Sequence, residues 1–138
     1  MINRLIYGVH RVLGTVLCLL PLCAIPVRGE SFVNDSLKVD GTWRHFTVFL
    51  PAGLQNDAPL VFVLHGYGGG IVRENPMTNA ARKHGFALCI PRGLKDPQNK
   101  NSWHVGYPFQ EGWKQNDVKA LCRLARYVQK RYALSQVN

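Results

Sequence analysis

Long apolar runs and clustered charges are both scarce in this chain of 138 residues. The uncharged apolar run at residues 12–26 has 15 residues and two prolines, which makes it short for a membrane span. Basic residues are spread along the chain, with no basic run of the kind that binds nucleic acid. We therefore expect neither a stable membrane anchor nor a nucleic-acid partner. The length suits one soluble domain and is too short for two well-packed domains.

The N-terminus has the pattern of a secretory signal peptide. Residues 1–11 carry two arginines and no acidic residue, and the apolar run follows directly. Val27 and Gly29 are small enough for the positions before a cleavage site. We therefore predict a signal over residues 1–29 and one domain over residues 30–138, secreted to the periplasm or the extracellular space. Without the signal, 14 basic and 8 acidic residues remain, a net charge of +6.

Cysteines are also few, and only Cys89 and Cys122 follow the predicted signal. Both lie in apolar stretches. An oxidising compartment permits a disulfide between them, and two buried free thiols fit the sequence at least as well. The pairing of these two residues stays open at this point.

The rest of the chain shows strands alternating with helices. Apolar and polar residues alternate on both sides of Asp40-Gly41, which predicts a β-hairpin. Phe46, Val48 and Leu50 are expected on one face of its second strand. The uniformly apolar runs at residues 60–64 and 86–90 predict central strands of a parallel sheet, covered on both faces. This order indicates an α/β fold.

Two helices are predicted between and after these strands. Asn75-Pro76 predicts the start of a short helix that ends at Gly85. Asn116 predicts the cap of a longer amphipathic helix. The apolar face of the first helix is expected to comprise Met77, Ala80, Ala81 and His84, and that of the second Val118, Leu121, Cys122, Ala125, Val128 and Tyr132. Residues 133–138 are expected to form a turn that enters another strand.

The segment at residues 92–115 has no periodicity and predicts a long, structureless loop, a feature that is usually functional. Trp103, Tyr107 and Trp113 stand out in it as candidate substrate-binding residues. Their rings are expected either to form a platform for a sugar or a phenolic acyl group, or to cover the core below the loop. The sequence leaves these two alternatives open.

The stretch "PLVFVLHGYGGG" at residues 59–70 joins a predicted strand to a glycine-rich loop. It is not a phosphate-binding P-loop, because Ile71-Val72-Arg73 stands where Lys-Ser or Lys-Thr would be needed. It also lacks the third glycine of the dinucleotide fingerprint. A loop that binds a tetrahedral oxyanion and a plain flexible turn remain. No second metal ligand is spaced near His65, so we expect His65 to hydrogen-bond to the backbone and hold the loop.

Four blocks of sequence together carry a resemblance to a known family: "RHFTVFLPAGL", "PLVFVLHGYGGG", "HGFALCIPRGLKDPQNKNSWHVGY" and "GWKQNDVKALCRLARYVQKRYALS". From about Trp43 to its end, the chain resembles the N-terminal half of the secreted polyhydroxybutyrate depolymerase and feruloyl esterase family. The resemblance implies an α/β-hydrolase fold and a serine esterase that acts on a polyester or on polysaccharide-linked esters. It implies no metal and no organic cofactor.

The same resemblance implies roles for individual residues. The backbone N–H of Tyr67, supported by His65, Gly66 and Gly68, would form half of an oxyanion hole. The loop from Arg92 to Trp113 would border the substrate cleft. Asp117 would open the helix before the nucleophile strand, in a structural role.

The nucleophile elbow G-x-S-x-G of such enzymes does not occur in the 138 residues. The acid and base of the triad follow the nucleophile in the chain, so Asp96, Asp117, His84 and His104 come too early to be these residues. We therefore expect a fragment truncated before the nucleophile elbow, with all three catalytic residues after Asn138. Such a fragment would be inactive alone, and the strand at residues 60–64 would keep an open edge. The alternative is a non-catalytic secreted carbohydrate-binding protein that uses the aromatic loop at residues 92–115.

Overall fold

A computed structural model describes residues 29–136 of the chain. The predicted signal therefore lies outside the described residues, apart from Gly29. Within residues 29–136, no helix combines the length and the apolar character that crossing a membrane requires.

The predicted hairpin is confirmed. Strand β1 (Ser31–Val39) pairs antiparallel with β2 (Thr42–Leu50), and Val39 lies opposite Thr42. Asp40 and Gly41 between them both have positive φ, 49° and 82°. A two-residue turn with two positive φ angles matches the twist of the flanking strands, which is why Asp-Gly favours a hairpin.

The hairpin continues into a four-stranded sheet of order β1-β2-β4-β3. Strand β4 (Ala87–Pro91) pairs antiparallel with β2 and parallel with β3 (Leu60–Phe62). All five residues of β4 are buried, as expected for a central strand. The open edge predicted for the strand at residues 60–64 is present, because β3 lies at the edge of the sheet and is not central among the described strands. Beyond β3, Leu64 is 47% exposed.

Helix α1 (Pro76–His84) begins and ends where the sequence predicts. The Asn75 side chain accepts the Met77 N–H, and Gly85 closes the helix at a φ of 69°. The predicted apolar face is partly wrong, since Met77 and His84 are exposed and the buried residues are Thr78 and Ala81. Thr78 is buried because its hydroxyl bonds to the Arg73 carbonyl and accepts the Asn75 N–H, which closes the cap.

Helix α2 (Asp117–Tyr132) also starts as predicted, with the Asn116 side chain accepting the Lys119 N–H at 2.8 Å. Its predicted apolar stripe is partly wrong: Val128 and Tyr132 are buried as predicted, but Val118 is 74% exposed and Cys122 is exposed as well. Asp117 bonds to Arg44 of β2, and this contact turns the row that starts at Asp117 toward the sheet. The buried residues of α2 are Asp117, Ala120, Leu124, Val128 and Tyr132.

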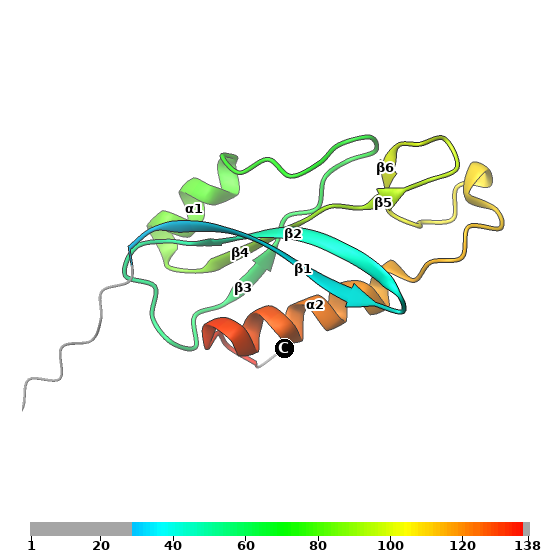
Figure 1. Cartoon of the computed structure of the whole chain (residues 1–138). Coiled ribbons are helices and arrows are strands. Elements are labelled where there is room, and N and C mark those ends of the chain that lie inside the picture. Colours follow the sequence, from blue (N-terminus) through cyan, green and yellow to red (C-terminus); the bar gives the residue numbers. More distant parts are fainter. Residues whose placement is uncertain (1–28, 137–138) are drawn as a thin grey trace, which may run out of the picture.

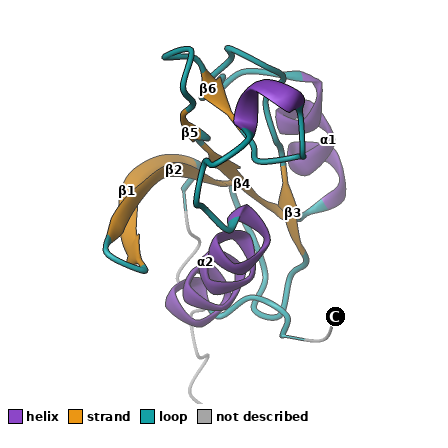
Figure 2. Ribbon diagram, turned by 90° about the vertical axis from the view of Figure 1, so that its right-hand side faces the viewer, coloured by secondary structure: helices purple, strands orange, loops and turns teal. Residues whose placement is uncertain are grey.

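The two helices lie on opposite faces of the sheet (Figures 1 and 2). Phe46, Val48 and Leu50 share the face that packs against α2, as the hairpin pattern predicts. Phe49, Leu88 and Ile90 form the core on the face of α1. The architecture is therefore a mixed sheet between helices, with alternate residues of each strand buried in different cores.

Segment 92–115 is not structureless, contrary to the prediction. It contains a small hairpin of β5 (Leu94–Lys95) and β6 (Asn101–Ser102) and a 3-10 turn, η1 (Pro108–Gln110). The segment lies at one end of the sheet, beyond the end of β4 (Figure 1). Elements this short leave no periodic pattern in the sequence.

After α2 the chain turns at Ala133, and the Ser135 N–H donates to the Ala58 carbonyl at 3.0 Å. The predicted turn is present, and no strand begins before Gln136. Cys89 is buried, Cys122 is exposed, and both are free thiols. Burial raises the pKa of the Cys89 thiol well above its usual range.

Candidate functional site

The glycine-rich loop begins where β3 ends, beside the end of the parallel strand β4. The Gly93 N–H, just after β4, donates to His65 Nε2 at 2.9 Å. The other ring nitrogen, Nδ1, lies 2.7 Å from the Gly66 carbonyl oxygen. These two bonds assign the hydrogen of the neutral ring to Nδ1. His65 thus hydrogen-bonds to backbone on both sides and holds the loop, as predicted from the sequence.

Trp103 supports the same loop from the side of β6. Its indole N–H donates to the His65 carbonyl at 3.0 Å. The two ring centroids lie 5.1 Å apart, and the rings are tilted by 35°. The aromatic ring of Trp103 is therefore engaged with His65.

The later glycines of the loop are fastened to Asn101 of β6. The Gly68 N–H donates to the Asn101 carbonyl at 2.8 Å, and the Asn101 side-chain amide donates to the Gly69 carbonyl at 2.6 Å. Gly68 has a φ of 75°, and a Cβ atom on Gly69 would lie 3.0 Å from the Gly66 carbonyl oxygen. Both positions favour glycine, and the bonds show that this loop is more than a flexible turn.

The backbone N–H groups of Gly66 and Tyr67 differ from those of Gly68 and Gly69. Within residues 29–136, neither the Gly66 nor the Tyr67 N–H donates to any acceptor. Tyr67 itself is 49% exposed, and its phenol donates to Gln98 Oε1 at 2.8 Å. Desolvation, followed by the nearby Asp96 carboxylate, raises the pKa of this phenol. The His65 and Gly70 N–H groups also lack an acceptor within these residues. Gly66 and Tyr67 therefore present adjacent donors on a braced backbone, an arrangement that can bind an anionic oxygen.

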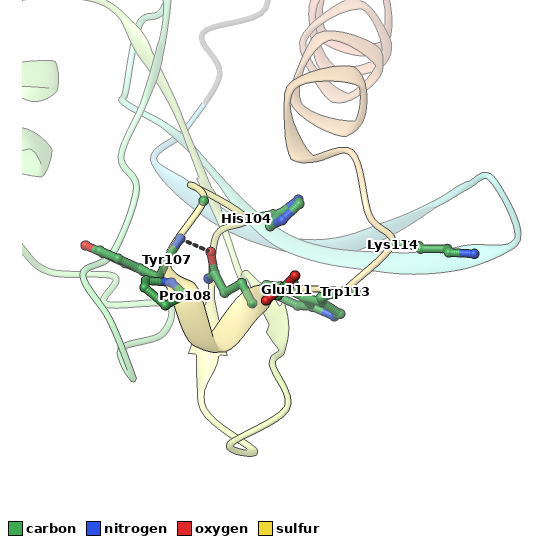
Figure 3. A pocket seen from close by; sticks show the side chains of 9 residues that line it. His104, Tyr107, Pro108, Glu111, Trp113 and Lys114 are labelled. Carbon is green, nitrogen blue, oxygen red and sulfur yellow. Dashed lines mark hydrogen bonds between the residues drawn. The ribbon is translucent and has the colours of Figure 1, made fainter.

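A cavity of about 400 Å³ lies around η1. Tyr107 precedes η1 and Trp113 follows it, and both line the cavity (Figure 3). Trp103 is not among the lining residues. The three candidate substrate-binding residues therefore separate into two groups, with Trp103 on the loop and the other two on the cavity. Further lining residues are His104, Pro108, Glu111 and Lys114.

Aromatic contacts connect this cavity to the glycine-rich loop. The Tyr107 ring stacks on Phe109 at 5.4 Å, and Phe109 meets the Tyr67 ring edge-on at 5.6 Å. On the other side of η1, Trp113 meets His104 at 5.7 Å. Phe109 would thus separate a ligand that contacts Tyr107 in the cavity from the Tyr67 ring on the loop.

Gln110 shapes the cavity and was missed by the sequence reasoning. Its buried side chain accepts the N–H groups of Val105 at 3.0 Å and Tyr107 at 3.2 Å. Its amide donates to Ser102 Oγ at 3.0 Å and to the Trp103 carbonyl at 2.9 Å. Asn101 was missed in the same way. A polar residue inside an irregular loop gives no periodic signal, so neither residue could be found from the pattern.

Asp117 lies behind the cavity and is 6% exposed. Its carboxylate pairs with Arg44 of β2 and accepts the His104 N–H at 2.6 Å and the Gln115 side-chain amide at 2.7 Å. These bonds join β2, the aromatic loop and the start of α2. Both carboxylate oxygens of Asp117 are therefore occupied by structural hydrogen bonds.

The described residues offer no assembled triad and no metal cluster. Ser102 is 2% exposed and bonds to Gln110, with no histidine beside it. Across residues 29–136, no group of three His, Cys, Asp or Glu side chains is placed to hold a metal ion. No model of a known protein family matches the sequence, and no curated protein matches it.

Proposed function

We propose that this chain supplies the oxyanion-binding loop of a secreted carboxylic ester hydrolase. The substrate would be a polyester such as polyhydroxybutyrate or an ester linked to plant polysaccharide, as in polyhydroxybutyrate depolymerases and feruloyl esterases. The mixed sheet would be the N-terminal part of an α/β-hydrolase fold. No cofactor enters the proposed reaction.

One observation supports the proposal: the Gly66 and Tyr67 N–H groups have no acceptor within the described residues, while His65, Gly68 and Gly69 beside them are fastened to Gly93, Trp103 and Asn101. A donor that stabilises a tetrahedral oxyanion must be fixed before the charge develops. A loop that served only as a turn would not need this bracing. The end of β3 is also where α/β hydrolases place such a loop.

In the proposed reaction, a serine activated by a histidine attacks the ester carbonyl. The Tyr67 N–H and the N–H after the nucleophile then stabilise the oxyanion. The serine, acid and base are absent from the 138 residues and would be supplied by residues that follow Asn138. The chain alone would consequently form no acyl-enzyme.

The first test measures hydrolysis of p-nitrophenyl acetate by the 138-residue chain beside its Tyr67→Pro variant, which loses the N–H donor. We expect equal, background rates for both. Faster hydrolysis by the unchanged chain would show that it holds its own nucleophile and would contradict the proposed division of the site.

The second test reads the gene downstream of codon 138 for an in-frame G-x-S-x-G. If it is present, the extended product should hydrolyse the ester, and Tyr67→Pro should lower kcat about 100-fold or more. Tyr67→Phe is the matched control, because it removes the phenol and keeps the backbone N–H. A downstream frame without the motif, or an equal loss in both variants, would refute the role of this loop.

The cavity around η1 favours a second candidate function, a non-catalytic carbohydrate-binding protein. Its volume of about 400 Å³ is in the range of small-ligand sites, and Tyr107 and Trp113 can stack on sugar rings. Titration with xylo-oligosaccharides should then quench tryptophan fluorescence, and Trp113→Ala should abolish the response. Exposed Trp43 provides the control, since Trp43→Ala should leave binding unchanged.

A further inference from the structure

A second cavity has a volume of about 340 Å³. It is lined by Asn34 of β1, His45 and Thr47 of β2, Arg73 before α1, and Arg92 after β4. None of these residues lines the cavity around η1 or belongs to the glycine-rich loop. The Arg92 N–H donates to the His45 carbonyl at 2.9 Å, which fixes these two residues beside each other.

Both arginines of this cavity lack a carboxylate partner in the part of the chain that the structure describes. The Arg73 guanidinium donates to Asn34 Oδ1 at 3.0 Å and lies 5.9 Å from the Phe32 ring centroid. The neighbouring Glu74 makes its ion pair with Arg82 at 2.9 Å, which also pairs with Glu30 at 2.8 Å. The Arg92 side chain makes no hydrogen bond within residues 29–136.

One acidic residue, Asp35, lines the cavity among the described residues, and its carboxylate is already engaged. Its Oδ2 accepts the Tyr127 hydroxyl at 2.9 Å and lies 3.7 Å from Arg131 Nε, both on α2. Its Oδ1 accepts the Ser36 N–H at 2.7 Å. The cavity therefore holds two guanidinium groups that have no ion-pair partner among the described residues.

We propose that this cavity binds an oxyanion group, a carboxylate or a phosphate, between Arg73 and Arg92. A guanidinium presents N–H donors in a fork that matches two oxygens of such a group. The His45 ring supplies one more N–H donor in either neutral tautomer. The volume is sufficient for the anionic group together with a small organic body, such as a sugar acid. This inference stands independently of the esterase proposal.

The proposal is tested by equilibrium dialysis of the 138-residue chain against labelled inorganic phosphate, D-glucuronate and D-glucose. This method measures binding whether the chain is monomeric or self-associated. We expect binding of at least one of the two anions and none of glucose. Arg73→Gln combined with Arg92→Gln should weaken anion binding at least about tenfold, since each removes a charged hydrogen bond. Added salt should weaken binding in the unchanged chain, because both arginines are exposed.

The matched control is Arg123→Gln combined with Arg126→Gln, two exposed positions of α2 that change the net charge equally. Unchanged anion binding in this control supports the cavity, and an equal loss would reveal general attraction to a basic surface and overturn it. Binding of phosphate alone would identify the bound group as a phosphate. Binding of glucuronate alone would identify it as a carboxylate. Absence of binding to both anions refutes the proposal.

Discussion

At the scale of single residues, the glycine-rich loop depends on a few polar contacts. The Gly93 N–H, the Trp103 indole N–H and the Asn101 amide each make one bond to it. A typical hydrogen bond contributes about 1 kcal/mol net. Because the loop has no apolar core of its own, the loss of any one contact should loosen the two donors at Gly66 and Tyr67.

Gly93→Ala should destabilise the fold by about 1–3 kcal/mol, because it overpacks a filled space. A Cβ atom at this position would collide with the Ser102 carbonyl oxygen and lie 2.9 Å from the Ser102 carbonyl carbon. Urea unfolding followed by tryptophan fluorescence measures the change. Gly66→Ala is the control, since no atom lies within 4 Å of its Cβ position. An equal effect of both substitutions would contradict the steric argument.

Asp117→Asn should destabilise the fold by about 3–5 kcal/mol, because it leaves the Arg44 charge buried without a partner. The same urea experiment measures it. Asp40→Asn removes the carboxylate of an exposed pair with Lys119 and should barely change the urea midpoint. If the two variants unfolded at the same urea concentration, the buried pair would not have the role assigned to it.

Sequence reasoning reached the residues of the site unevenly. The bracing role of His65 could be predicted, because a histidine after a buried strand without nearby metal ligands has few other tasks. Gln110 and Asn101 could not be predicted, since their bonds depend on how an irregular loop closes on itself. Gly93 was equally hidden, because its space is filled by Ser102 on another strand.

At the scale of elements, starts and ends follow local chemistry, whereas the orientation of a helix does not. Asn75, Gly85 and Asn116 could be identified as caps because capping involves neighbours in the sequence. Of the buried face of α2, Val128 and Tyr132 could be predicted, but its N-terminal part could not, because that part includes the contact between Asp117 and Arg44, 73 residues apart. Val118 and Cys122 are exposed for that reason.

The C-terminal end of α2 offers a prediction of increased stability. Ala133 has a left-handed conformation with a φ of 54°, which glycine adopts without the clash of a Cβ atom. Ala133→Gly should stabilise the fold by about 1 kcal/mol. Ala125→Gly, inside the same helix, should destabilise it by about 1 kcal/mol. Thermal melting by circular dichroism compares them, and a lower melting temperature for Ala133→Gly would contradict the prediction.

At the scale of the whole molecule, the sheet ends in an edge strand on each side. Among the described strands, β1 pairs only with β2, and β3 pairs only with β4. The Val63 N–H donates to the Cys89 carbonyl, so the alternate N–H groups of Phe62 and Leu64 face outward. An apolar open edge favours pairing with another chain.

We therefore expect the chain to self-associate and to be poorly soluble. Leu64→Lys should reduce this association, because a charge at an edge strand opposes pairing. Val72→Lys is the control, because it adds the same charge outside the edge strand. Val72 is 59% exposed and Leu64 is 47% exposed, and we expect Val72→Lys to have little effect on association. Sedimentation velocity over a range of concentrations distinguishes them. A monomer that melts cooperatively without substitution would contradict the expectation.

The division of the glycine-rich loop into free and bonded N–H groups also has a consequence for its exchange with solvent deuterons. The Gly66 and Tyr67 amides have no acceptor within the described residues, whereas the Gly68 and Gly69 amides bond to Asn101 and Gly66. Exchange requires an open amide, so a sharp change from rapid to protected exchange should occur between residues 67 and 68. Such a boundary inside four consecutive residues would show in solution which donors the loop keeps available and which it uses to hold its own shape.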